Sequence, residues 1–227
     1  MGKICWRIAV FPLVAAIVLL AGCGGGDGGG EGEGSIKIGA SLPLTGDFSE
    51  PGVAAKQGYQ IWQQLVNQNG GLLGRDVQIV VKDDQSDQNL VVTDYNALIN
   101  REKVDLLLGT FSSLLNLPAS AVAERNKMVY VEPAGGSPEM FNRGFTYLFF
   151  AQQATAPHQA DLFSDWVTNL PAGQKPKTAA YVAADDPFGG PVAEGIQDKL
   201  QDGGVRTVYS KIYPPETVNF DAIASAV

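Results

Sequence analysis

The chain has 227 residues, a formal net charge of −8 at neutral pH and two cysteines, Cys5 and Cys23. A negative net charge argues against binding to nucleic acid and against electrostatic adhesion to anionic lipid surfaces. The length suffices for one ordinary α/β domain and part of a second.

The first residues form a basic and then an apolar segment. Lys3 and Arg7 precede the segment Ile8–Leu20. This segment is apolar throughout but shorter than the roughly 20 residues that span a bilayer. This pattern is typical of a secretory signal. The next letters, LAGC at 20–23, resemble the lipobox of bacterial lipoproteins, in which the cysteine is lipidated. The alternative is a plain signal cleaved within the following glycine run, with Cys23 incidental.

The lipobox resemblance implies three segments before the folded body. Residues 1–22 are the signal peptide, Cys23 carries the lipid anchor, and residues 23–35 form a tether rich in glycine and acids. Cleavage also removes Cys5, so the mature body has no disulfide, no thiolate nucleophile and no cysteine-ligated zinc. The predicted location is the outer side of a membrane of the bacterial cell envelope, with the lipid as the anchor.

Strand and helix patterns alternate from residue 36 onward. Strands are expected at 36–42, 77–82, 104–108 and 128–131, and a helix is expected at 112–125. A helix at 53–68 is expected to bury the stripe Ala54, Ile61, Trp62, Leu65 and Val66. The next helix has the stripe Val91, Tyr95, Leu98 and Ile99, and Asp87 is expected to cap its start.

The regular alternation of strand and helix patterns is interrupted near 132–150, and we interpret this segment as the crossing to a second lobe. An amphipathic helix with Leu162, Phe163, Trp166, Val167 and Leu170 follows, and then strands at 178–182 and 205–212 around a helix with Val192, Ile196 and Leu200. Regular β-α-β alternation predicts parallel sheets with helices on both faces. We therefore expect a first α/β lobe at 36–150 and a partial second lobe at 151–227. Because a two-strand sheet leaves its edges unpaired, we expect a fragment of a longer chain.

Several stretches stand in the order and spacing of a known family. They are IKIGASLPLTGDFSEPG at 36–52, NQNGGLLGRDVQIVVKDDQSD at 67–87, LLLGTFSS at 106–113, VEPAGGSPEMF at 131–141, DDPFGGPVAEGIQDKL at 185–200 and NFDAIASAV at 219–227. Together they resemble the solute-binding lipoproteins of ABC transporters for branched-chain amino acids and related amides. The resemblance implies the type I periplasmic binding fold, with two doubly wound parallel-sheet lobes joined by crossing strands, the second lobe here incomplete.

The first candidate ligand loop follows the strand at 104–108. Ligands of open α/β sheets bind at the carboxyl ends of strands, near helix N-termini. A serine at the next helix start places a hydroxyl beside unpaired N–H groups, which suits a carboxylate or an amide carbonyl. We expect Ser112 or Ser113 to cap the helix. The resemblance implies that Ser113, with Ser112 beside it, contacts the ligand.

The second candidate loop is Glu132–Ser137. The resemblance implies that this loop presents backbone groups to the ligand, and Ala134 matches the family's pattern. Gly136 departs from that pattern, because threonine or serine is usual there. We expect the glycine to enlarge the pocket, which argues against a simple leucine- or valine-like ligand, and Ser137 to supply the hydroxyl instead.

The resemblance places two further residues at the site. Phe188 matches an aromatic position that covers the ligand, although an aromatic residue there is also compatible with a core position. Gly189-Gly190 place it in a loop. Thr155 stands where the family brings a polar side chain from the hinge. The acid that would bind an ammonium group is expected beyond Val227.

The sequence gives no support for an enzyme, a metal site or a cofactor. Ser113 lacks a G-x-S-x-G context, and the single histidine, His158, is expected at a helix start. Adjacent acids on an extended chain point in opposite directions, so the pairs 83–84 and 185–186 are interpreted as solvated loop ends.

The leading hypothesis is capture of a small amino-acid-like or amide-like solute and its delivery to an ABC permease. The first alternative is a ligand sensor on the same fold that acts on a signalling partner. The second is a cell-surface hydrolase, which would need a nucleophile and a base beyond Val227.

Overall fold

The structure is a computed structural model that describes residues 34–215 and 217–227. The described residues belong to one compact unit. The predicted signal peptide, the predicted lipid-attachment residue Cys23 and all but the last two residues of the predicted tether lie outside them. Those predictions are therefore not tested by the structure.

The first sheet has five parallel strands in the order β2-β1-β3-β4-β5. They are β1 (Ile36–Leu42), β2 (Val77–Asp83), β3 (Leu106–Leu108), β4 (Tyr130–Glu132) and β5 (Leu148–Phe150). From β1 the chain adds β2 on one side and then β3, β4 and β5 on the other. The direction of winding therefore reverses between β1 and β3, which makes the sheet doubly wound with its switch point at these two strands. β5 pairs with β4. The interpretation of 132–150 as a crossing is therefore wrong, because β5 completes this sheet.

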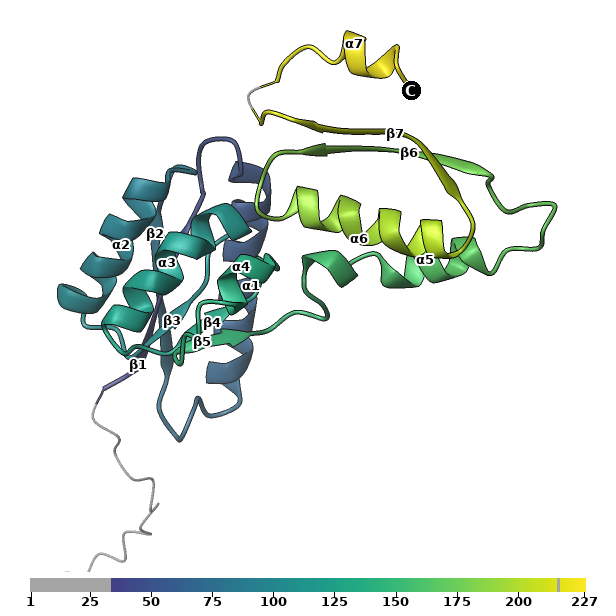
Figure 1. The fold of residues 1–227 in the computed structure, drawn as a ribbon. Coiled ribbons are helices and arrows are strands. Elements are labelled where there is room, and N and C mark those ends of the chain that lie inside the picture. Colours follow the sequence, from purple (N-terminus) through teal and green to yellow (C-terminus); the bar gives the residue numbers. More distant parts are fainter. Residues whose placement is uncertain (1–33, 216) are drawn as a thin grey trace, which may run out of the picture. The chain divides into compact units, whose positions relative to one another are not determined.

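Two apolar cores cover the two faces of the first sheet. α2 (Gln88–Asn100) and α3 (Ser113–Arg125) share one core with Leu107, whereas Leu106 and Leu108 pack with residues of α1 (Ser49–Gln68) in the other. Figure 1 shows α1 on the opposite side of this sheet from α2 and α3. Because neighbouring strand residues point to opposite faces, three leucines in a row serve both cores.

The predicted apolar face of α1 is largely wrong, because Val66 alone of the predicted stripe packs against the core on this side of the sheet. Ile61, Trp62 and Leu65 are 58%, 39% and 54% exposed. Beside Val66, the side of α1 facing the sheet carries amides. The Asn67 Oδ1 atom accepts from Val77 N at 2.7 Å, Asn67 Nδ2 donates to Val77 O at 2.9 Å, and Gln63 Oε1 accepts from Ile79 N at 2.7 Å. β2 is an edge strand, so these amides bind backbone groups that the sheet leaves unpaired.

The second sheet pairs β6 (Thr178–Ala184) with β7 (Arg206–Tyr213) in parallel. Its helices are α5 (Asp161–Thr168) and α6 (Gly189–Asp202), with η1 (Ala156–His158) before them and α7 (Asp221–Ala224) after β7. Figure 1 shows α5 and α6 on one side of the β6–β7 pair. The predicted stripe of α5 is largely wrong, because Leu162, Phe163 and Trp166 are exposed and only Val167 is buried in the small core with Tyr181, Leu200 and Val205.

The α/β class with parallel sheets and covering helices is confirmed. Among the described residues, no helix has the length and apolar character needed to cross a membrane. α4 (Pro138–Phe141) lies between β4 and β5. The loops that leave β3 and β4 at their carboxyl ends contain the predicted first-lobe site residues.

Candidate ligand-binding site

Asn116 determines the path of the loop between β3 and α3. Its side chain is fully buried, its Nδ2 donates to Thr110 O at 2.8 Å and to Ser112 O at 3.0 Å, and its Oδ1 accepts from Thr110 N at 3.2 Å. A Cβ on Gly109 would lie 2.7 Å from the same Oδ1. The loop can therefore reach Asn116 only with a glycine at its start.

The two serines at the start of α3 do not cap it with their side chains. Ser112 precedes the first helical residue, but its hydroxyl accepts no backbone hydrogen bond. The buried hydroxyl of Ser113 instead accepts from Ser137 N at 3.1 Å. The prediction of a serine side-chain cap is therefore wrong.

The start of α3 therefore keeps free donors. The first intrahelical bond of α3 runs from Asn116 N to Ser112 O, and the preceding N–H groups, at 113–115, have no acceptor among the described residues. Free N–H groups at a helix N-terminus favour a carboxylate or another anionic oxygen.

The loop after β4 lies against the start of α3. A Cβ on Gly135 would lie 3.1 Å from Ser113 Cα, which is a tight contact, so the glycine eases this close approach. Ser137 is buried and its hydroxyl accepts from Glu139 N at 3.3 Å, which caps α4. The structure thus brings Ser113, Ala134 and Ser137 to one carboxyl edge of the sheet, as the sequence predicts.

Gly136 does not enlarge a pocket. A Cβ at this position would lie 3.0 Å from Ala156 N and 3.3 Å from Phe188 Cε2, and Gly136 O already accepts from Ala156 N at 2.6 Å. The space that a side chain would fill is occupied by the Thr155–Ala156 backbone and the Phe188 ring. The predicted enlargement is therefore wrong, and the glycine instead permits close approach of these groups.

Phe188 immediately precedes α6. Asp186 Oδ1 accepts from Phe188 N and from Gly189 N, both at 2.7 Å. Gly189-Gly190 are thus the first residues of the helix and not a loop. A cavity of about 500 Å³ adjoins this turn and is lined by Ser137, Pro138, Glu139, Asp185, Asp186, Pro187 and Pro191. Ligand contact by Phe188 and Thr155 remains a prediction.

Asp84 is a buried acid at the end of β2. Its side chain has no exposed surface and accepts from Thr110 Oγ1 at 2.9 Å and Ser86 N at 3.0 Å. Burial raises the pKa of Asp84 to about 6, against the lowering effect of these hydrogen bonds. Its neighbour Asp83 accepts from Leu44 N at 2.9 Å. The interpretation of this acid pair as a solvated loop end is wrong for Asp84.

Glu132 is a second buried acid, and the sequence analysis did not single it out. It is the last residue of β4, its side chain is fully buried, and burial raises its pKa to about 7. The available signal was its place at the end of a buried strand, directly before the candidate loop.

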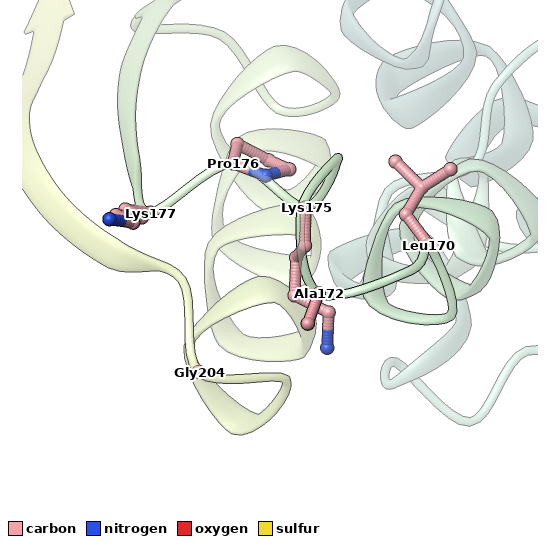
Figure 2. Close-up of a pocket in the computed structure, with 6 residues that line it drawn as sticks. All are labelled: Leu170, Ala172, Lys175, Pro176, Lys177 and Gly204. Carbon is pink, nitrogen blue, oxygen red and sulfur yellow. The ribbon is translucent and has the colours of Figure 1, made fainter.

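A separate surface cavity of about 370 Å³ lies at the amino ends of β6 and β7. Figure 2 shows its lining residues: Leu170, Ala172, Lys175, Pro176, Lys177 and Gly204. Ligands of open α/β sheets bind at the carboxyl ends of the strands. This cavity is therefore not part of the candidate site.

His158 lies on the surface at the end of η1, 3.2 Å from Asp161. Its side chain is 64% exposed. In the hydrogen bonds of the described residues its ring contacts Asp161, and no serine, threonine or cysteine side chain lies beside it. Within residues 34–215 and 217–227, no three His, Cys, Asp or Glu side chains are grouped so as to hold a metal ion.

Comparison with known proteins identifies the family. The sequence model described as "Periplasmic binding protein" matches residues 35–227. The chain belongs to the periplasmic binding protein family. A Leu/Ile/Val-binding protein homologue of Brucella suis is 28% identical over 196 residues, which is 83% of this chain and 48% of that protein.

Solved structures of the family share the fold. The Streptococcus pneumoniae branched-chain amino acid transporter substrate-binding protein LivJ, in complex with isoleucine, aligns with a TM-score of 0.71 at 21% identity. A solute-binding protein of an ABC transporter from Rhodopseudomonas palustris, in complex with 3,4-dihydroxybenzoic acid, aligns with a TM-score of 0.73 at 18% identity. Each alignment covers 84% of this chain and 53% or 50% of the other. The chain thus spans about half the length of these relatives.

Proposed function

We propose that this periplasmic binding protein is the substrate-binding lipoprotein of an ABC transporter. It captures a small amino-acid-like or amide-like solute outside the cytoplasm and delivers it to a permease. The observation that carries the proposal is the meeting of the α3 N-terminus and the Ala134–Ser137 loop at the carboxyl edge of the first sheet. Open α/β sheets bind their ligands at such an edge.

A carboxylate is the ligand group that suits this edge. Isoleucine and 3,4-dihydroxybenzoic acid, bound by the two aligned relatives, differ in size and polarity but both carry a carboxyl group. The N–H groups at the start of α3 have no side-chain cap and carry partial positive charge. We assign the ligand carboxylate to these donors, beside Ser113, and the aromatic cover to Phe188.

The proposed cellular place follows from the sequence. Residues 1–22 direct export, Cys23 receives the lipid, and the glycine-rich tether lets the binding body reach a permease while it stays attached to the membrane. Closure around the solute would form the surface that the permease recognises. Export of a Cys23→Ala variant without lipid labelling would support the anchor, whereas unchanged lipid labelling would contradict it.

Isothermal titration tests the binding function on the full-length gene product. The panel contains leucine, isoleucine, valine, their amides and 3,4-dihydroxybenzoate, and the expected dissociation constant lies between about 1 nM and 1 μM for at least one compound. Ser113→Ala removes the acceptor of Ser137 N and is expected to weaken binding about tenfold. The matched control is Ser210→Ala, an exposed position on β7. Absence of heat with every compound would contradict the proposal.

A further inference from the structure

Glu132 connects three segments of the candidate site. Its Oε1 accepts from Ala134 N at 2.5 Å and from Asn116 Nδ2 at 3.4 Å, and its Oε2 accepts from Gln152 Nε2 at 3.2 Å. Ala134 belongs to the candidate loop, Asn116 to α3, and Gln152 to the segment after β5. One buried carboxylate therefore lies where the loop, the helix and this segment meet.

The surroundings of Glu132 supply donors but no cation. The ion pairs found among the described residues do not include it. The ionisable groups that face it are Tyr59 of α1 and Tyr130 of β4, whose pKa values are raised by burial and by the Glu132 charge, so both stay neutral. The carboxylate is thus held by neutral N–H groups.

We propose that Glu132 is a positioning residue of the ligand site, whose ionised carboxylate holds the Ala134–Ser137 loop against Asn116 and Gln152 in the arrangement that binds ligand. The proposal rests on the proposed function and goes beyond it by naming a residue that controls the site without touching the solute. Its side chain is fully buried, so it acts through the groups that its carboxylate contacts, which also include the backbone of Gly135.

The hydrogen-bond pattern favours the ionised form of Glu132. Every group that its carboxyl contacts is a donor, and the Asn116 Oδ1 atom already accepts from Tyr130 Oη and Thr110 N. A protonated carboxyl would bring an O–H toward donors and lose an acceptor. Because burial raises the pKa of Glu132 to about 7, the two forms exchange near neutral pH. Protonation therefore loosens the loop as the pH falls through this value.

Ligand affinity across pH 5.5–8.5, measured by isothermal titration on the full-length protein, tests the proposal. The wild type is expected to bind about tenfold more weakly at the acid end, because a hydrogen bond to a charged acceptor is lost. Glu132→Gln mimics the protonated group, so it should match the wild type at pH 5.5 and lack the transition near pH 7. A flat wild-type profile, or an unchanged profile in Glu132→Gln, would overturn the proposal.

Two further variants separate positioning from folding. Gln152→Ala removes one donor from the carboxylate and keeps the buried acid, so it should move the midpoint of the affinity profile to higher pH. Glu194→Gln removes an exposed carboxyl on α6 and should leave the profile unchanged. A midpoint that does not move in Gln152→Ala, or one that moves equally in Glu194→Gln, counts against the proposal.

A ligand-free measurement keeps this inference separate from the proposed function. The backbone amide of Ala134, followed by NMR, should titrate near neutral pH in the wild type and not in Glu132→Gln. If no solute binds at any pH, the proposed function fails, and the Ala134 titration still decides the role of Glu132. An Ala134 amide that does not respond to pH would overturn that role.

Discussion

At the scale of single residues, buried polar side chains shape the candidate site. Asn116 accepts from Tyr130 Oη at 2.5 Å and donates to the backbone of the loop after β3. Asp84 accepts from Thr110 Oγ1 in the same loop. Such networks favour a single arrangement of the loop. A buried polar group left without a partner costs more free energy than a formed hydrogen bond contributes to stability.

We expect Asn116→Ala to lower the free energy of unfolding by about 2–4 kcal/mol, because Tyr130 Oη and Thr110 N lose their acceptor in a buried place. Chemical denaturation measures this change. Asn96→Ala is the matched control, since Asn96 donates to Val92 O on its own half-buried helix turn, and about 1 kcal/mol or less is expected there. Equal losses in the two variants would contradict the role assigned to Asn116.

The burial of Asp84 and Glu132 could not be predicted from the sequence, because it depends on partners that are distant along the chain. Asp84 is covered by Ser41 and Thr110, and Glu132 by Asn116 and Gln152. A carboxyl at a strand end usually faces solvent. The place of Ser113 at the carboxyl edge of the sheet was predictable, because it starts a helix after a buried strand, whereas its predicted side-chain cap was wrong.

At the scale of elements, prediction succeeded where apolar spacing alone decides burial. β1, β2 and α2 lie where their patterns indicate, and Asp87 caps α2 by accepting from Asn89 N and Leu90 N. The buried face of α1 failed because a helix over an edge strand needs amides toward the strand. Local periodicity does not record which strand becomes the edge.

Asn67→Ala tests this account of α1. The substitution leaves Val77 N and Val77 O without their partners, so we expect a loss of roughly 1–3 kcal/mol in the free energy of unfolding. Gln64→Ala, an exposed neighbour on the same helix, should change it by less than about 0.5 kcal/mol. Amide exchange at Val77 should accelerate in Asn67→Ala only. An unchanged exchange rate there would refute the edge-covering role.

At the scale of the whole molecule, buried acids with raised pKa values shape how stability depends on pH; Glu132 and Asp84 contribute most, and the pKa of Asp94 is raised by burial as well. Glu132 and Asp84 keep their protons in the folded state to about pH 7 and 6, whereas unfolding returns both to lower values. The unfolded chain therefore binds fewer protons between about pH 4 and 7. Stability falls as the pH rises through this window and levels off above it.

We expect the free energy of unfolding to be higher at pH 5 than at pH 7.5 by on the order of 2 kcal/mol. Denaturation curves of the full-length protein at the two pH values measure the difference. Glu132→Gln should reduce it, because an uncharged amide does not titrate. A stability that rises from pH 5 to pH 7.5 would be inconsistent with raised pKa values at Glu132 and Asp84.

The arrangement of aromatic residues affects how binding can be observed. Trp62 and Trp166 are exposed on α1 and α5, and Trp6 lies outside the described residues. Tyr95 and Tyr130 are buried with ring centroids 5.4 Å apart, and Tyr130 contacts Asn116 beneath the candidate loops. Among the described residues, fluorescence excited in the tryptophan band therefore comes from exposed rings. With Trp62→Phe and Trp166→Phe, the buried tyrosine pair is the chromophore within these residues that lies beside the site of ligand capture.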